Sequence, residues 1–197
     1  ISPTKYKNLD IVPAVGELSD LEVELSTRMQ REILLQRSMA KSLNVLSKYD
    51  YIIIDNNPGI GLLTVNALSA SDYVLIPIEP SAFSFDGLAK LLEIIEMVKN
   101  INPDLKIMGI LLTRVDNRTN LEEFFRYNLK LFSLNVFFTT IYQNVDVARS
   151  QMANMPLGEY NPGAKAAREY MDLAFEVVAR AEGVEFTGKF AKGIGGK

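Results

Sequence analysis

The 197-residue sequence contains neither cysteine nor histidine. The absence of cysteine excludes disulfides, thiolate nucleophiles, and the zinc and iron–sulfur sites that thiolates hold. The absence of histidine removes the commonest general base and the commonest metal ligand. Any chemistry must therefore rely on carboxylates, amides, hydroxyls, Lys, Arg and the backbone. Phosphate chemistry with a hard cation such as magnesium is one of the few enzyme classes that works with this set.

Long apolar runs are also missing, and none approaches the roughly 18–20 residues that a membrane-spanning helix needs. The first seven residues, ISPTKYK, lack the apolar core of a signal peptide, so we expect a cytoplasmic protein. With 48% hydrophobic residues the chain can bury a sizeable core. We expect one α/β domain over residues 1–182, followed by a flexible tail rich in Gly and Lys over residues 183–197.

Strand-like and helix-like segments alternate along the sequence. Apolar runs predict strands over residues 8–14, 49–55, 72–78, 105–113 and 135–141. Apolar residues at helical spacing predict helices over residues 18–48, from Ser84 to Asn102-Pro103, and over Ala164–Ala181. This alternation is typical of βαβ units. We therefore predict an α/β fold with a mostly parallel sheet, central strand Tyr49–Asp55, and helices on both faces.

One acid, Asp55, ends the apolar run that begins at Tyr51 and precedes a Gly-containing loop, Asn56–Gly61. In open parallel sheets, ligands bind at the C-terminal ends of the strands. In P-loop NTPases a carboxylate at this position holds magnesium, usually through water, and the following loop senses the terminal phosphate. The ordinary alternative is an Asp that caps the next helix. The local pattern leaves both interpretations open.

Several ordered blocks of the sequence resemble the ParA family of partition ATPases, relatives of the MinD-type cell-division regulators. The blocks are YDYIIID (49–55), LLTVNAL (62–68), IPIEPSAFSFDGL (76–88), LLTRVDNRT (111–119) and TTIYQNV (139–145). Their order and spacing make the resemblance specific, and it extends over about residues 5–180. It implies a P-loop NTPase-like fold.

The family's phosphate loop, K-G-G-x-G-K-[ST], does not occur in the 197 residues. Family order places it upstream of Ile1, so we expect the N-terminal βαβ portion, roughly 30 residues or more, to be missing. ATP hydrolysis is then expected in the complete protein and not in residues 1–197 alone. Two departures fall in functional places, because Asn57 and Tyr142 each stand where the family has proline.

The resemblance implies a site for ATP and Mg²⁺. Asp55 would be the catalytic residue and would hold the metal through water. The switch loop would comprise Asn56, Asn57, Pro58, Gly59 and Gly61. The nucleoside would contact Thr113, Arg114, Tyr142, Gln143 and Asn144. A polar helix-capping turn over residues 113–116 and an ordinary loop over residues 142–144 are the alternatives.

The resemblance also implies non-specific DNA binding, driven by neutralisation of DNA phosphates. Candidate contacts are Arg126, Lys130, Arg149, Lys165 and Arg168, and the alternative is an ordinary solvated face. The family further implies an ATP-dependent homodimer, a centromere-binding ParB-like partner, and a role on the nucleoid in plasmid or chromosome partition.

Two other functions are compatible with the pattern. One is a non-catalytic interaction module with the ParA fold. The other is a MinD-like membrane-associated regulator, because Phe186, Phe190 and Ile194 recur every four residues in the tail. The many glycines of the tail disfavour a stable helix there, so membrane binding is not expected.

Overall fold

The computed structural model describes residues 1–14, 23–57, 59–184 and 186. Within them the chain divides into two compact units. The first comprises Ile1–Ser71 and Ile94–Pro103, and the second comprises Asp72–Glu93 and the chain from Asp104 onward. The expectation of one domain over residues 1–182 stays a prediction.

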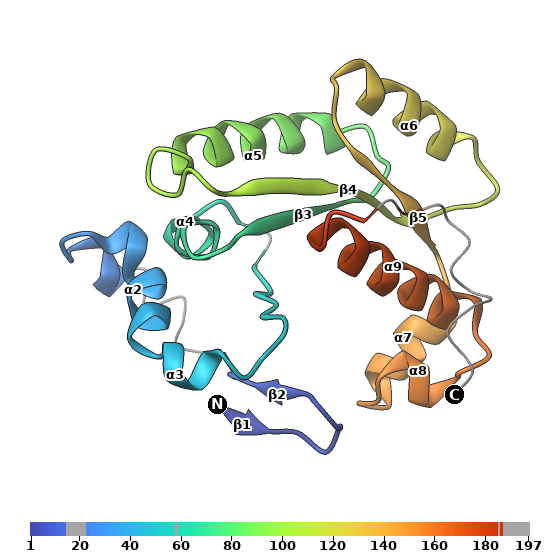
Figure 1. Ribbon diagram of the computed structural model, residues 1–197. Coiled ribbons are helices and arrows are strands. Elements are labelled where there is room, and N and C mark those ends of the chain that lie inside the picture. The colour runs from blue at the N-terminus through green and yellow to red at the C-terminus, as the bar shows by residue number, and fades with distance from the viewer. Residues whose placement is uncertain (15–22, 58, 185, 187–197) are drawn as a thin grey trace. The chain divides into compact units, whose positions relative to one another are not determined.

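The second unit is built on a three-stranded parallel sheet in the order β3-β4-β5. The strands are β3 (Tyr73–Ile78), β4 (Lys106–Val115) and β5 (Val136–Tyr142). The helix α5 (Ser84–Val98) connects β3 to β4, and α6 (Leu121–Leu131) connects β4 to β5. Figure 1 shows both of these helices on one face of the sheet and α9 (Lys165–Ala181) on the other. The predicted α/β fold, with a parallel sheet and helices on both faces, is confirmed.

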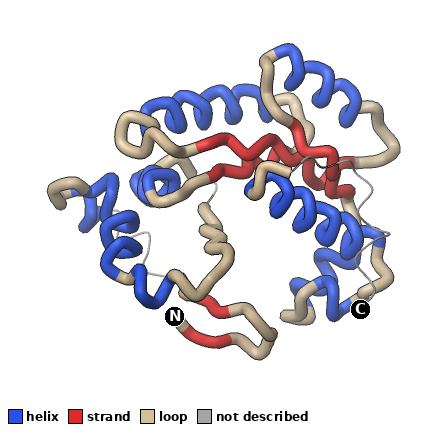
Figure 2. Tube along the Cα trace, viewed as in Figure 1, coloured by secondary structure: helices blue, strands red, loops and turns tan. Residues whose placement is uncertain are grey.

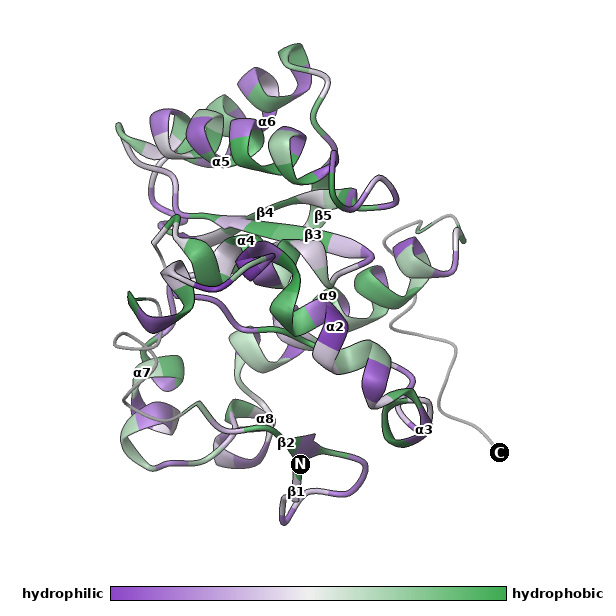
Figure 3. Cartoon of the chain, turned by 90° about the vertical axis from the view of Figure 1, so that its left-hand side faces the viewer, coloured by the Kyte–Doolittle hydropathy of each residue, from purple (hydrophilic) through white to green (hydrophobic). Residues whose placement is uncertain are grey.

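The core of this unit follows the alternation of side chains along the strands. On one face, Leu111, Phe137 and Ile141 form a buried cluster, and Leu173 and Val177 of α9 pack against it. Figure 3 shows β4, the middle strand, mostly in the green of hydrophobic residues. A strand covered on both faces needs such a continuous apolar run, which is why the sequence located it.

The helix α5 begins at Ser84, where the sequence predicts, and ends four residues before the predicted end at Asn102-Pro103. At its start, the hydroxyl of Ser84 accepts a hydrogen bond from the amide of Ser81 (3.2 Å) and donates one to the carbonyl of Glu79. The helix ends at Val98, five residues before Pro103, where a helix cannot continue. Between β5 and α9 the chain forms α7 (Val145–Met152) and α8 (Leu157–Tyr160).

The first unit contains a short hairpin, in which β1 (Ser2–Pro3) pairs antiparallel with β2 (Asp10–Ile11). The strand predicted over residues 8–14 is therefore two residues long. The single helix predicted over residues 18–48 is wrong. Residues 23–26 are helical, and they are followed by η1 (Arg31–Ile33), α2 (Leu34–Lys41) and α3 (Leu43–Leu46).

The break in this helix has a local cause. The hydroxyls of Ser26 and Thr27 donate hydrogen bonds to the carbonyls of Val23 (2.6 Å) and Glu24 (3.0 Å). Such bonds compete with the helical backbone pattern. Gln30 then adopts the left-handed conformation, with φ 55°, which no helix continues through.

The helix α4 (Leu62–Ser69) matches the block LLTVNAL. Its buried Asn66 donates to the carbonyl of Arg31 (2.7 Å) and accepts from the amide of Leu35 (3.1 Å). One amide side chain therefore ties α4 to η1 and α2. A buried amide side chain does not destabilise the fold when both its oxygen and its nitrogen have hydrogen-bond partners.

The prediction that Tyr49–Asp55 is a central strand is wrong for this structure. No described segment pairs with these residues, and the exposed fraction of Ile53 is 91%. Figure 2 draws the segment between α3 and α4 as loop. A strand exists through hydrogen bonds to a neighbour, so an apolar run with no neighbouring strand remains extended and unpaired.

Most of the predicted tail, including Phe190 and Ile194, lies outside the described residues. Within the part of the chain that the structure describes, no helix is both long enough and apolar enough to cross a membrane.

Candidate functional site

The C-terminal ends of β4 and β5 lie side by side, with Val115 opposite Tyr142. The amide of Gln143 donates to the carbonyl of Val115 (2.9 Å), which joins the two strand ends. The residues that follow border a hollow of about 440 Å³. Its lining is Val115, Asn117, Arg118, Thr119, Asn120, Glu122, Glu123, Tyr142 and Lys165. Ligands of open parallel sheets bind at this kind of edge.

Tyr142 is held from three directions. Its hydroxyl donates to Oε2 of Glu122 on α6 (2.6 Å), and its amide donates to Oε2 of Glu169 on α9 (3.1 Å). The ammonium of Lys165 lies 4.0 Å from the centroid of its ring, a cation–π contact, and forms an ion pair with Glu169 (3.4 Å). These contacts fix both the backbone and the ring plane.

Glu122 is the hub of the hydrogen bonds around this ring. Its Oε1 accepts from the hydroxyl of Thr140 (2.7 Å) and from Nε of Arg126 (3.0 Å). Burial raises the pKa of Glu122, but the hydrogen bonds from Tyr142, Thr140 and Arg126 outweigh it, so the pKa lies below its ordinary value. The carboxylate beside the phenol in turn raises the pKa of Tyr142 to about 12.

This pair predicts a measurable titration. Because the pKa of Tyr142 is raised from 10.0 to about 12, its hydrogen bond stabilises the fold fully below pH 10.0, and that stability is lost as pH rises through about 12. Subtracting the ultraviolet titration curve of Tyr142→Phe from that of the wild type isolates the titration of this phenol. With Glu122→Ala the pKa should move back towards 10.0, since the largest cause of the shift is removed. A wild-type pKa near 10.0 would show that the bond does not form.

The turn after β4 is fixed by an ion pair. The guanidinium of Arg118 binds Asp116 through both carboxylate oxygens (2.7–3.2 Å), and Arg118 lowers the pKa of Asp116 to about 2. The hydroxyl of Thr119 closes the turn on the carbonyl of Asp116 (2.9 Å). Exposed Asn117 and Asn120 remain at the hollow, where their amides can both donate and accept hydrogen bonds.

Of the five predicted nucleoside contacts, Tyr142 lines the hollow, and the other four are not among its lining residues. Arg114 has a left-handed backbone (φ 52°), and its guanidinium forms an ion pair with Glu79 (3.5 Å). Thr113 is half-buried within β4. Gln143 is exposed, and the side chain of Asn144 caps α7 by accepting from the amide of Asp146 (2.8 Å).

Sequence reasoning missed Glu122 and Glu169, the two carboxylates that position Tyr142. Glu122 lies in the first turn of α6, where acids are common because they complement the helix dipole. Glu169 lies on α9, 27 positions from Tyr142. The sequence carries no local signal for either contact.

Asp55 belongs to the first unit, where it is exposed and its carboxylate makes no hydrogen bond or ion pair with another described residue. The alternative role as a helix cap is not realised. The N-cap of α4 is Gly61, and no side chain accepts its first amides. An unpaired carboxylate suits Mg²⁺, which keeps several waters and takes one or two carboxylates together with phosphate oxygens. Among the described residues no three His, Cys, Asp or Glu side chains gather into a metal cluster.

The rest of the predicted switch loop lies between Asp55 and α4. Asn56 donates to the carbonyl of Ile54 (3.4 Å), and the hydroxyl of Thr64 donates to the carbonyl of Gly59 (2.7 Å). Asn57 is exposed, and Pro58 lies outside the described residues.

The predicted DNA contacts differ in how far their charges are engaged. The guanidinium of Arg126 donates to the carbonyls of Phe137 (2.8 Å) and Phe138 (3.0 Å) as well as to Glu122. The charge of Arg126 is therefore committed inside the protein. The remaining candidates are exposed at their charged ends to different degrees: Lys130 is exposed, Arg149 pairs with Asp146 (3.6 Å), Lys165 contacts Tyr142, and Arg168 donates to the carbonyl of Gly163 (3.3 Å).

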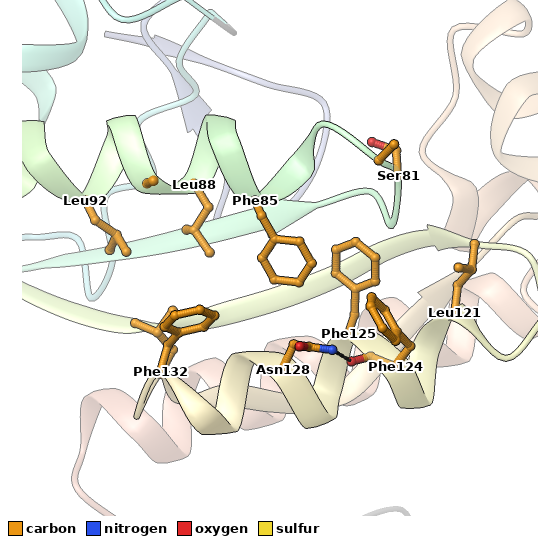
Figure 4. A pocket seen from close by; sticks show the side chains of 12 residues that line it. Ser81, Phe85, Leu88, Leu92, Leu121, Phe124, Phe125, Asn128 and Phe132 are labelled. Carbon is orange, nitrogen blue, oxygen red and sulfur yellow. Dashed lines mark hydrogen bonds between the residues drawn. The ribbon is translucent and has the colours of Figure 1, made fainter.

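A second hollow, of about 830 Å³, lies between α5 and α6. Figure 4 shows Phe85 of α5 facing Phe125 of α6, and the two rings stack with centroids 4.6 Å apart. Phe124 and Phe132 border the same hollow, and both are more than half exposed. This apolar groove contains none of the predicted site residues.

A family sequence model and several known proteins match this chain over most of its length or over more than half of it. The sequence model of the family described as "AAA domain" matches residues 1–107. The chain is 41% identical over 185 residues to the sporulation initiation inhibitor protein Soj of Bacillus subtilis, covering 91% of this chain and 70% of that protein. It is 37% identical to the chromosome partitioning protein ParA of Myxococcus xanthus, covering 91% of this chain and 63% of that protein.

A solved structure of cobyrinic acid a,c-diamide synthase from Mycobacterium smegmatis, with bound ATP analog and magnesium, matches with a TM-score of 0.70 and 28% identity. The match covers 89% of this chain and 66% of that one. This chain therefore spans just under two thirds of the length of the synthase, and 63% of the length of the Myxococcus relative. Sequence blocks, sheet topology and relatives agree, and the chain belongs to the ParA-type family of partition ATPases.

Proposed function

We propose that the full-length protein is a partition ATPase of plasmid or chromosome segregation. In this proposal it binds ATP and Mg²⁺, forms a homodimer, and binds DNA without sequence preference. A centromere-binding ParB-like partner would stimulate it, and it would act in the cytoplasm on the nucleoid. The observation that carries the proposal is the polar hollow at the ends of β4 and β5, bordered by the fixed ring of Tyr142.

The residues of the hollow suit a nucleoside. The Tyr142 ring offers a flat aromatic surface, and the amides of Asn117 and Asn120 match the alternating donors and acceptors on the edge of a base. Gln143, Asn144, Thr113 and Arg114, which follow or end the same two strands in the sequence, remain proposed contacts to the rest of the nucleotide.

In the first unit, Asp55 and the loop over residues 56–61 are the proposed metal and phosphate contacts. The carboxylate of Asp55 would hold the hydrated Mg²⁺, and the loop of Asn56, Asn57, Pro58, Gly59 and Gly61 would respond to the terminal phosphate. When bound, Mg²⁺ supplies charge neutralisation for phosphoryl transfer.

Nucleotide-dependent dimerisation tests the proposal directly. We expect the full-length protein with Mg²⁺ and a slowly hydrolysed ATP analogue to sediment as a dimer, and with ADP as a monomer. Duplex DNA of unrelated sequences should bind to the dimer with similar affinities. Full-length protein that binds neither nucleotide in calorimetry would refute the ATPase function, and DNA binding that does not depend on ATP would refute the proposed coupling.

DNA binding should weaken steeply with salt, because each neutralised phosphate releases condensed counterions. We expect Lys130→Ala to make the slope of log K against log salt shallower by about one unit, whatever the DNA sequence. Lys130 is the better test than Arg126, since removing Arg126 also breaks its bonds to Phe137 and Phe138. Lys90→Ala, an exposed lysine of α5 outside the candidate set, is the matched control. An unchanged slope in Lys130→Ala would exclude α6 from the DNA face.

A further inference from the structure

We propose that Glu122 is a positioning residue of the nucleoside site, whose carboxylate fixes the ring of Tyr142 as one wall of the hollow. The inference rests on the proposed function, because it concerns how that site recognises the base. It assigns a role to a side chain at the border of the hollow that the sequence analysis did not single out.

The hydrogen bonds that lead to the ring form a continuous series. The carbonyls of Phe137 and Phe138 on β5 accept from Arg126, whose Nε donates to Glu122 (3.0 Å). Glu122 then accepts the hydroxyl of Tyr142 at 2.6 Å. These hydrogen bonds therefore anchor the ring to the backbone of β5, the strand that carries Tyr142.

Both oxygens of Glu122 are engaged, and this makes its position well defined. Oε1 accepts from Thr140 and Arg126, which leaves Oε2 for Tyr142. The side chains of Glu122 and Arg126 are 23% and 25% exposed, so solvent competes only in part for these bonds.

The tyrosine at position 142 gains from being held in place before the ligand binds. A free tyrosine side chain has two rotatable torsions, and ordering them on ligand binding would oppose affinity. With the hydroxyl bound to Glu122, the ring is already ordered when the base arrives. Aromatic contacts of this kind change affinity by about two- to twelvefold, and we expect about a fivefold effect here.

The test compares two ligands of the full-length protein in calorimetry, ATP and inorganic tripolyphosphate. Tripolyphosphate has no base, so a positioning role for Glu122 predicts that Glu122→Ala weakens ATP about fivefold and leaves tripolyphosphate unchanged. Glu122→Gln keeps an acceptor oxygen for the tyrosine hydroxyl and should retain most of the ATP affinity. Glu93→Ala, the same substitution at an exposed glutamate of α5, should match the wild type for both ligands.

Tyr142→Phe removes the same hydrogen bond from the other side. It should resemble Glu122→Ala, and the double variant should be no weaker than either single one, because both substitutions break one contact. If Glu122→Ala fails to fold, Tyr142→Phe carries the test, since it leaves Glu122 bonded to Arg126 and Thr140.

The outcomes separate this inference from the proposed function. A wild-type protein that binds neither ligand would refute the function and the inference together. Wild-type ATP binding that Glu122→Ala leaves unchanged, or a loss equal for ATP and tripolyphosphate, would overturn the positioning role alone.

Discussion

The full-length protein carrying Asp55→Asn should hydrolyse ATP about a hundredfold more slowly than the wild type and should melt at the same temperature. The substitution is isosteric, and Asp55 makes no hydrogen bond or ion pair with another described residue that the change could break. A neutral amide holds hydrated Mg²⁺ less well than a carboxylate does. Weaker stabilisation of the charge that develops in phosphoryl transfer costs on the order of 3 kcal/mol, which corresponds to the hundredfold effect.

Steady-state hydrolysis rates and melting temperatures of the same two proteins are the required measurements. Asp50→Asn, an exposed acid five positions earlier, provides the control for the lost charge, and its turnover should equal that of the wild type. ATP-dependent dimerisation should suffer less than hydrolysis, because the phosphate loop of the complete family fold would supply most of the ground-state binding. Normal turnover in Asp55→Asn would remove this residue from the site.

The second large effect is on stability, at Glu176 of α9. This carboxylate is fully buried, with an exposed fraction of 0%. It accepts hydrogen bonds from the amides of Phe138 (2.8 Å) and Thr139 (2.9 Å) in β5 and from Nη2 of Arg180 (2.7 Å). Glu176→Ala should lower the free energy of unfolding by about 3–5 kcal/mol, since it leaves a partly buried cation and two strand amides without their acceptor.

Arg180 explains why the loss should be this large. Its guanidinium also donates to the carbonyls of Met108 (2.8 Å) and Val136 (2.9 Å), so it cannot turn out to solvent without breaking those bonds. A β-carbon at Gly109 would lie 2.7 Å from Nη1 of Arg180, and this position therefore needs glycine. The glycine makes room for the ion pair.

Urea denaturation of Glu176→Ala against the wild type measures this effect. Glu182→Ala, an exposed glutamate just after the end of the same helix, is the matched control and should change stability by less than about 0.5 kcal/mol. Glu176→Gln, which keeps an acceptor oxygen but loses the charge, should fall between the two. A loss below about 1 kcal/mol in Glu176→Ala would mean that solvent or neighbouring groups replace the carboxylate.

The sequence by itself determined the elements whose formation depends on local chemistry. The apolar runs of β3, β4 and β5 are the pattern that a strand covered on both faces requires, and Pro103 excludes any continuation of α5. The ordered blocks also located Tyr142 at a strand end and Asp55 before a loop. These features are properties of short stretches, so the sequence contains them.

Tertiary structure decided everything that needs a partner distant in the chain. Residues 49–55 have the composition of a strand but remain unpaired, because pairing depends on a neighbour and not on the residues themselves. Arg126 has the sequence features of a solvated DNA contact, yet it donates to carbonyls 11 and 12 positions away. Glu122 and Tyr142 meet across 20 positions because α6 returns the chain alongside β5. Hydrogen bonds of this kind leave no periodicity in the sequence, and the fold alone brings their donors and acceptors within reach.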